Sequence, residues 1–353
     1  MSVQIVAYAP ERLEALTPSL REMSGPRGDR FYRWRLGGPP SATTWLAMLG
    51  DTCGAMLSSM RKQYVIGGMQ TDCYEIYNWS SAERFRGKGL GIMLLKRLMA
   101  EGVPIVNIGG SEDTLRLLPR LGWDTISHSR VLALPLSGRF IQRRLKDRSP
   151  TAAILGRIAF EALGRAWYHA HRPHPPKGWR AVPVTGFDSR LSELYLRRRS
   201  HALASIPDPA ILDWATNGLS RSGLFLRFHF FQGSTLAGWG MARILTTVDG
   251  GRSSEIVDAY AAEPDVEVYR WVIAEMVSAS AGLGADSVVT SATCPIMCAA
   301  LRAERFVAAH SNVVRAWWPG KRPFPTGPIH LMRGSADHFL LPLPSEAELE
   351  HGA

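Results

Sequence analysis

A glycine-rich stretch, ERFRGKGLGIMLLKRLM at residues 83–99, is the part of the 353-residue chain whose residue types and spacing best predict chemistry. Gly87, Gly89 and Gly91 lie among basic residues and lead into an apolar run with helical spacing. Backbone N–H groups at the start of a helix, together with the helix dipole, form an anion site, and glycines let phosphate oxygens approach the backbone closely. The stretch therefore predicts a phosphate-binding loop.

The spacing of the glycines excludes two common phosphate loops. The stretch lacks the G-x-x-x-x-G-K-[ST] pattern of a nucleoside triphosphate loop, and it does not complete G-x-G-x-x-G with an acidic residue about 20 positions later. Arg86-x-x-Gly89-x-Gly91 fits a third pattern, R/Q-x-x-G-x-G/A. On this motif the chain resembles the GNAT superfamily of acyl-CoA-dependent N-acyltransferases, whose coenzyme pyrophosphate sits on such a loop between a central strand and a helix.

The order of elements extends this resemblance over residues 3–136. In the family the motif follows a strand and precedes a helix, a strand, a second helix and a G-[FYW] dipeptide, which here is Gly122-Trp123. The resemblance implies that acetyl-CoA or another short acyl-CoA is the co-substrate. The residues implied to bind it are Arg86, Gly87, Lys88, Gly89, Leu90, Gly91 and Ile92.

The catalytic residues are less well defined by the sequence. Amide formation from a thioester requires an uncharged amine, so a base or a water chain must receive a proton. The resemblance implies that Glu75 is the candidate base, because GNAT enzymes often place a glutamate base on the strand before the loop; the alternative is an outward-facing strand residue. Asp72 lies just before this strand. Cys73 is read as a buried structural cysteine rather than a nucleophile. The family's usual tyrosine acid is missing, because Leu118 takes its position and Ser111 takes that of a common asparagine.

Hydrophobic periodicity predicts the elements that position these residues. Strands are expected at 3–8, 44–49, 54–64, 73–79, 105–108, 123–126 and 130–136, with helices at 11–23, from the glycines to about 101, and at 111–121, while 25–38 reads as a polar, glycine-rich stretch. The second half repeats this order, with strands at 224–231, 236–244, 255–261, 287–291 and from 306, and helices at 267–280 and 295–304. The pattern predicts an α/β (α+β) fold of two tandem GNAT-like domains, each a mixed, mostly antiparallel central sheet flanked by helices.

We expect three regions: an N-terminal GNAT domain with the acyl-CoA loop at 1–138, a basic linker with a helix over 152–169 at 139–179, and a degenerate C-terminal GNAT-like domain at 180–353. In the last region the stretch equivalent to the loop reads AAEPDVEVYRWVIAEM. Its acidic residues Glu263, Asp265 and Glu267 would repel a pyrophosphate, so one coenzyme per chain is expected. A degenerate copy commonly serves as scaffold or as part of the acceptor cleft.

Other residues of the second half have two possible interpretations each, one structural and one functional. Several aromatics are read as core rather than as an acceptor cleft: Trp214, Phe228, Phe230, Trp239 and Tyr260. The polar group near the C-terminal glycine turn is interpreted as a polar loop rather than an acceptor contact: His330, Arg333, Asp337 and His338. His169, His171 and His174 are read as solvated linker residues rather than a zinc site. No metal site is expected, since the four cysteines are scattered.

The net charge of +10 admits nucleic acid, anionic lipid or an anionic small molecule as partner. The basic run 143–150 makes weak membrane-surface contact conceivable, but without a reading motif we expect no nucleic-acid partner. Without a leader pattern or a span of roughly 18 apolar residues, a cytoplasmic protein is expected. The C-terminal end resembles that of tandem GNAT proteins found with bacterial polysaccharide or sugar-modifying systems, which suggests a bacterial origin. The oligomeric state stays open. The predicted function is an N-acyltransferase acting on a small-molecule amine, such as an amino sugar or an amino acid derivative, by direct attack in a ternary complex. The alternative is a non-catalytic GNAT-like binding or scaffold module.

Overall fold

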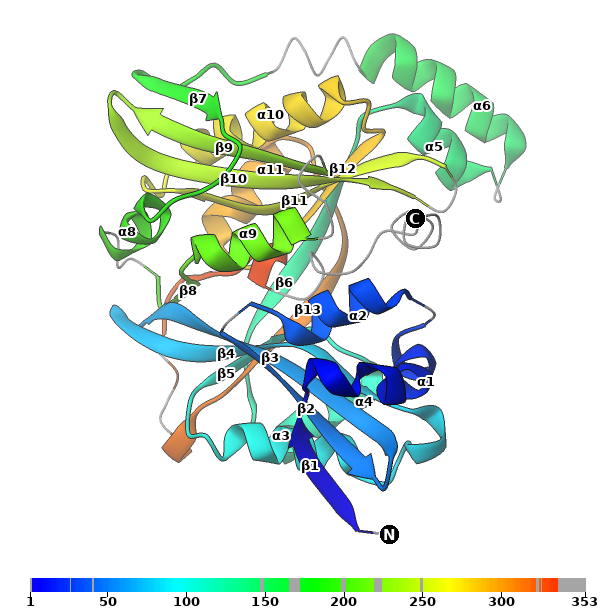
Figure 1. The fold of residues 1–353 in the computed structure, drawn as a ribbon. Coiled ribbons are helices and arrows are strands. Elements are labelled where there is room, and N and C mark those ends of the chain that lie inside the picture. The colour runs from blue at the N-terminus through cyan, green and yellow to red at the C-terminus, as the bar shows by residue number, and fades with distance from the viewer. Residues whose placement is uncertain are drawn as a thin grey trace.

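The computed structural model describes residues 2–25, 27–39, 41–146, 149–164, 172–197, 201–218, 224–247, 250–321, 324 and 326–335. The chain forms two α/β halves that lie one above the other in Figure 1. The first half contains β1 (Val3–Ala7), α1 (Leu13–Ser24), α2 (Asp29–Gly37), β2 (Ala42–Leu49), β3 (Thr52–Ile66), β4 (Met69–Ser81), α3 (Leu90–Met99), β5 (Ile105–Ile108), α4 (Glu112–Arg120) and β6 (Asp124–Pro135).

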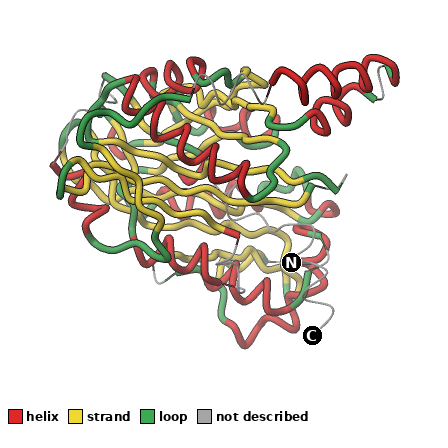
Figure 2. Tube along the Cα trace, turned by 90° about the horizontal axis from the view of Figure 1, so that it is seen from above, coloured by secondary structure: helices red, strands yellow, loops and turns green. Residues whose placement is uncertain are grey.

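Two helices, α5 (Gly138–Leu145) and α6 (Pro150–Ala159), follow the first half and extend to one side of the molecule (Figure 2). The second half contains β7 (Trp179–Pro183), α8 (Arg190–Arg197), β8 (Leu203–Ser205), α9 (Pro209–Asn217), β9 (Phe225–Gln232), β10 (Thr235–Thr246), β11 (Arg252–Ala261), α10 (Val266–Gly282), β12 (Ser287–Ala292), α11 (Pro295–Ala303), β13 (Val307–Trp317) and β14 (Ile329–His330). Among the described residues, no helix combines the length and apolar character needed to cross a membrane.

The two halves share one continuous sheet, in the order β1-β2-β3-β4-β5-β13-β6-β12-β11-β10-β9-β7. One long strand of each half, β6 of the first and β13 of the second, lies in the other half's part of the sheet. β6 pairs with β12, with Leu134 opposite Val288, and β13 pairs with β5, with Ala316 opposite Val106. This exchange explains why β6 and β13 run through the middle of Figure 1, joining the halves.

Each half repeats the same local order of strand, helix, parallel strand and helix. β4 pairs in parallel with β5 across the helix α3, and β11 pairs in parallel with β12 across the helix α10. The predicted α/β fold, with a mixed, mostly antiparallel sheet flanked by helices, is confirmed. The division at residues 138 and 180 stays a prediction, and the strand exchange means that neither half completes its sheet from its own residues.

Helix α3 is held against the sheet by a leucine stripe. Leu90, Leu94, Leu95 and Leu98 recur with helical spacing, are at most 3% exposed and pack with Leu118 of α4. Burying a leucine side chain contributes about 1.5–3 kcal/mol. This stripe therefore fixes the start of α3, and with it the glycine loop, relative to β4.

Several elements carried no expectation, namely α5, α8, α9, β7, β8 and β14, and three expected segments differ in the structure. The stretch 25–38, expected to be polar and irregular, contains helix α2, because Phe31, Tyr32 and Leu36 place apolar groups on one buried face. The strands expected at 123–126 and 130–136 are one strand, β6, since pairing with both β12 and β13 keeps it extended. The helix expected over 152–169 begins at Pro150 behind the Ser149 N-cap and ends as α6 at Ala159, and residues 165–171 lie outside the described part of the chain.

Candidate active site

The glycine loop turns sharply between the end of β4 and the start of α3. Gly87 and Gly89 have φ values of 78° and 77°, in the left-handed region that favours glycine. A Cβ atom added to either residue would meet nothing within 4 Å, so the backbone there faces open space. Gly89 is also the N-cap of α3.

The first turn of α3 presents backbone amides as expected for an anion site. Met93 N donates to Gly89 O at 3.0 Å, which begins the helical hydrogen bonding. In the described part of the chain, the amides of Leu90, Gly91 and Ile92 have no backbone acceptor. These amides and the positive end of the helix dipole favour a bound anion.

Basic side chains surround this turn. Arg84, Arg86 and Lys88 are all exposed. Arg84 approaches Glu22 at 3.7 Å, and the Lys88 ammonium lies 5.0 Å from the centre of the Phe85 ring. The loop therefore combines free amides with exposed positive charge, which suits a di-anionic phosphate group.

A notch opens between β4 and β5 beside this loop. The two strands pair only at Tyr74 with Ile105 and at Glu75 with Val106, although β4 continues to Ser81. Two residues beyond Glu75, Tyr77 forms a bulge, because Ser58 pairs with Asn78 and Ser59 with Ile76. The bulge and the short pairing leave backbone groups of β4 available to an extended ligand.

The candidate base, Glu75, is 3% exposed and surrounded by donors. Lys62 Nζ lies 2.5 Å from Glu75 Oε2, while Tyr64 Oη and, at 3.4 Å, Ser205 Oγ donate to Oε1. Burial and the charge of Glu75 raise the pKa of Tyr64 well above its usual range, so the phenol keeps its proton and remains a donor. A buried carboxylate with a paired cation and two hydroxyl donors has its desolvation largely offset.

The other residues of the first half that the sequence analysis named have structural roles. Burial and the charge of Glu75 raise the pKa of the Cys73 thiol well above its usual range, which makes it a poor nucleophile. Asp72 pairs with Arg61 and Gln63. Leu118 is fully buried in the core under the sheet, and Ser111 caps α4 by accepting a hydrogen bond from Thr114 N at 3.2 Å.

An open cleft of about 710 Å³ lies beside Lys62 and is lined by both halves. The first half contributes Arg61, Lys62 and Asp72, and the second half contributes Ser192 and Asp208. This polar lining, next to the residue that pairs with Glu75, can receive a polar substrate.

The equivalent anion site in the second half is filled by the chain itself. The Asp265 carboxylate caps α10, accepting hydrogen bonds from Glu267 N at 2.6 Å and Val268 N at 3.2 Å. Parallel pairing of β11 and β12 ends at Glu255 and Val289, as it ends at Glu75 and Val106 in the first half. A second carboxylate therefore stands at the same place, and Glu255 pairs with Arg243 at 2.6 Å and with Arg333 at 2.8 Å.

The notch of the second half is also filled. Met332 forms a β-bridge with Ala292 at the end of β12, and its sulfur accepts a hydrogen bond from Ala259 N on β11 at 3.2 Å. The C-terminal segment thus lies between β11 and β12 beyond the point where their pairing ends. Among the residues read earlier in two ways, Phe228, Phe230, Trp239 and Tyr260 are buried in the core, and Trp214 stacks on Trp34 of the first half at 4.8 Å between ring centres.

The structure describes only some of the histidines that the sequence analysis grouped. His174 is exposed, which fits a solvated linker residue, whereas His169 and His171 lie outside the described residues, as do Asp337 and His338. His330 and Arg333 are not part of a polar loop: His330 is buried, and Arg333 pairs with Glu255. The sequence reading of these two as loop residues was wrong, because the segment fills the second notch.

No family model matches the sequence, and a search of curated proteins also gives no match. Solved structures share its fold. A GCN5-related N-acetyltransferase from Anabaena variabilis is 16% identical, with a TM-score of 0.59 over 89% of this chain and 72% of that one. A probable N-acyltransferase from Enterococcus faecalis is 11% identical, with a TM-score of 0.60 over 90% and 73% of the two chains.

Saccharomyces cerevisiae N-myristoyltransferase, solved with bound myristoyl-CoA, is 13% identical, with a TM-score of 0.59 over 92% of this chain and 83% of that one. At these identities the likeness concerns the fold alone. The chain therefore has the fold of the GNAT acyltransferases, as the sequence predicted, and the similarity extends over both halves.

Proposed function

We propose that the protein is an N-acyltransferase that uses acetyl-CoA or another short acyl-CoA to acylate an amine of a small molecule, such as an amino sugar or an amino acid derivative. The observation that carries this proposal is the open turn at Gly87 and Gly89, with three amides of α3 free beside exposed cations. The fold shared with acetyl- and myristoyltransferases adds support.

The chain's own groups suit a direct transfer. The residues proposed to hold the pyrophosphate are those of the loop, Arg86 to Ile92, and the notch along β4 would take the extended arm of the coenzyme. The coenzyme supplies an acyl group activated as a thioester. The amine nitrogen attacks the thioester carbonyl carbon, the C–N bond forms, the C–S bond breaks, and the sulfur leaves as the thiolate.

The proton released by the amine is proposed to pass to Glu75, directly or through a water chain. Lys62 and Tyr64 fix the orientation of the carboxylate, and Ser205 links it to the second half. The acceptor is proposed to enter through the cleft between the halves, where polar groups such as Ser192 and Asp208 would hydrogen-bond a polar amine.

A non-catalytic binding module is the second candidate. Two observations favour it: Leu118 offers no acid at the position of the family's tyrosine, and Glu75 is already held by an ammonium group. Such a module would bind the coenzyme without turnover.

One experiment separates the two candidates. The protein is incubated with acyl-CoA esters from acetyl to myristoyl and with a panel of small amines, and free CoA thiol is measured. Amine-dependent thiol release supports the transferase. A rise in melting temperature with acyl-CoA but no thiol release for any amine supports the binding module. Absence of both effects would refute the proposed coenzyme site.

A further inference from the structure

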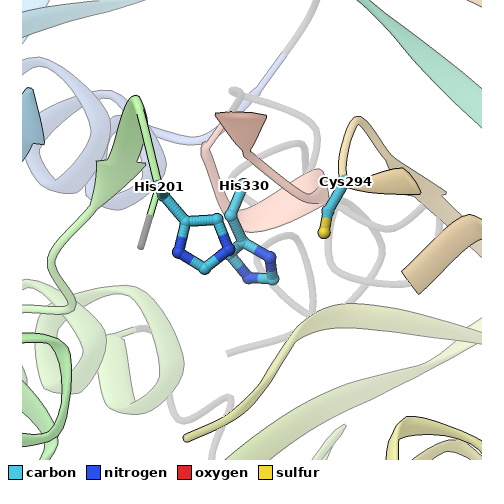
Figure 3. Close-up of side chains that lie close together, drawn as sticks. All are labelled: His201, Cys294 and His330. Carbon is cyan, nitrogen blue, oxygen red and sulfur yellow. The ribbon is translucent and has the colours of Figure 1, made fainter. Parts of the chain in front are cut away.

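Three potential metal ligands meet in the second half, outside the candidate active site. His201 precedes β8, Cys294 is the N-cap of α11, and His330 lies on β14. One ring nitrogen of each histidine and the sulfur of Cys294 all lie within 4.8 Å of one another (Figure 3). The residues are 9%, 3% and 2% exposed, respectively, so the cluster is buried.

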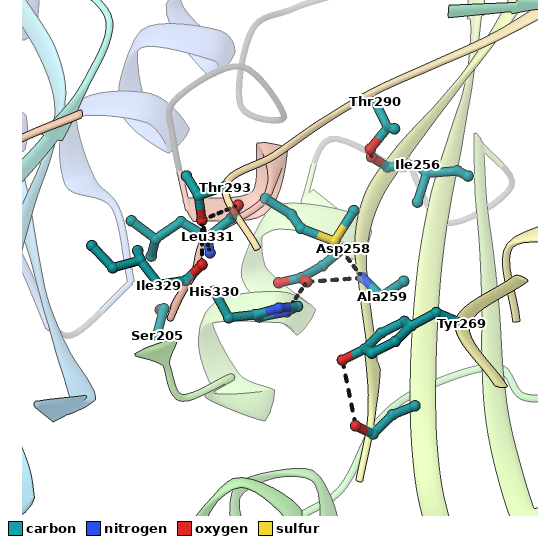
Figure 4. Close-up of polar contacts among 12 residues, drawn as sticks. Ser205, Ile256, Asp258, Ala259, Tyr269, Thr290, Thr293, Ile329, His330 and Leu331 are labelled. Atoms are coloured by element: carbon teal, nitrogen blue, oxygen red, sulfur yellow. Dashed lines mark hydrogen bonds and ion pairs between the residues drawn. The ribbon is translucent and has the colours of Figure 1, made fainter. Parts of the chain in front are cut away.

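His330 carries the strongest sign that a ligand belongs here. Both of its ring nitrogens are buried, and neither has a hydrogen-bond partner in the described part of the chain. Leaving buried polar atoms unpaired costs about 1–3 kcal/mol each. Asp258 Oδ1 lies 3.9 Å from His330 Nε2 and also accepts a hydrogen bond from Ala259 N at 2.8 Å (Figure 4).

We propose that His201, Cys294 and His330 bind a zinc ion. One thiolate and two imidazoles form a ligand set that suits Zn²⁺, and a water molecule would complete the tetrahedron. Tetrahedral zinc needs ligand atoms about 3.3–3.6 Å apart, so the side chains close by roughly 1 Å on binding. Asp258 then accepts a hydrogen bond from the second nitrogen of His330, the arrangement commonly found around zinc-bound histidines.

The zinc would hold β8 in place, a strand that pairs with elements of both halves. β8 pairs with β14, with His330 opposite Ala204, and also with β3, with Ser205 opposite Tyr64. His201 and His330 therefore flank the strand whose Ser205 donates to Glu75. A metal at this position stabilises the contact between the second half and the candidate base. This inference holds whether or not the protein is a transferase.

A nucleophilic cysteine is the competing reading of the same cluster. Burial raises the pKa of the Cys294 thiol, but the neighbouring imidazoles of His201 and His330 outweigh this effect and lower the pKa to about 5. Such a thiolate would exist without metal. Zinc is favoured because the thiol is 3% exposed, whereas a nucleophile must meet its acceptor, and because two histidines, rather than one, approach the sulfur.

The test uses the full-length protein freed of metal with a chelator and then loaded with Zn²⁺ or Co²⁺. We expect one ion per chain by elemental analysis, a higher melting temperature with Zn²⁺, and, with Co²⁺, tetrahedral visible bands together with a thiolate charge-transfer band. Cys294→Ser should lose the charge-transfer band. Asp258→Asn should weaken Zn²⁺ binding by about 10–100-fold.

Cys298→Ser is the matched control, because Cys298 is a buried cysteine one turn further along α11 whose sulfur donates to Ala292 O. It should keep the band and the stoichiometry. If Cys294→Ser does not fold, His201→Gln at the edge of the cluster replaces it and should lower metal content. No uptake of either metal, a charge-transfer band that survives Cys294→Ser, or transfer of an acetyl group from acetyl-CoA to Cys294 would overturn the proposal.

Discussion

Replacing Gly89 by aspartate should abolish coenzyme binding while the fold is retained. The second half provides the precedent, because the Asp265 carboxylate already occupies the equivalent helix start and accepts hydrogen bonds from two amides, at 2.6 and 3.2 Å. A side chain at Gly89 meets no neighbour within 4 Å, so an aspartate there fits and places its carboxylate next to the first amides of α3, although Gly89 has a left-handed backbone and Asp265 an extended one. Gly89→Asp would thus give the first half the closed anion site of the second.

The size of the effect has two parts, one on stability and one on binding. A non-glycine residue in the left-handed region costs about 1–2 kcal/mol, which is small beside the stability of a typical folded protein. A carboxylate about 4 Å from a phosphate is repelled by about 4 kcal/mol at an effective dielectric of 20. Binding of CoA should therefore weaken by about 10³-fold.

Isothermal titration calorimetry with CoA measures the change in affinity, and thermal unfolding measures the change in stability. Gly233→Asp is the matched control: Gly233 also has a positive φ, of 60°, and open space around its Cβ position, but it lies in the β9–β10 turn of the second half. The control should bind CoA as the unmodified protein does. If Gly89→Asp binds CoA with unchanged affinity, the loop is not the phosphate site.

Three further results are expected. Lys62→Met should lower the free energy of unfolding, measured in urea, by about 3–5 kcal/mol, because it leaves Glu75 buried without its cation. Adding Glu75→Gln should recover much of this stability. A double variant no more stable than Lys62→Met would contradict the pairing. Asp265→Ala should lower stability by about 0.5–2 kcal/mol without creating a second coenzyme site, since Met332 still fills the notch, and a titration reaching two CoA per chain would refute this. Burial raises the pKa of the Cys53 thiol to about 11, so at pH 8 roughly one thiol in a thousand is ionised. Iodoacetamide should therefore label Cys53 only in denatured protein, which mass spectrometry detects. Labelling of the native protein at the rate of a free thiol would argue against this burial.

Features carried by consecutive residues could be predicted from the sequence. The glycine loop at residues 86–92 depends on backbone conformation and on the start of the next helix, and both are local. The duplicated order of strands and helices was also readable, because each element follows its own periodicity. Helix α2 was missed, since its glycine-rich flanks resemble a loop, although Phe31, Tyr32 and Leu36 already had helical spacing.

Features that join distant residues could not be predicted. Glu75 was identified as a candidate base from its strand, but its partners Lys62, Tyr64 and Ser205 follow from the pairing of β4 with β3 and of β3 with β8. His201 carried no sequence signal, and Cys294 and His330 were assigned to unrelated segments. The spacing from 201 to 294 to 330 matches no metal motif, because the ligands come from three separate elements.

The sequence by itself determined an open glycine turn at the start of α3 and an aspartate cap at the start of α10, because glycine and aspartate act on the amides next to them in the chain. Only the tertiary structure decided the rest. The exchange of β6 and β13 between halves, the closing of the second notch by the C-terminal segment, and the meeting of two histidines with Cys294 all depend on which strands pair. Strand pairing joins residues up to some 200 positions apart, such as Asn107 with Arg315, and a local pattern of residue types carries no record of it.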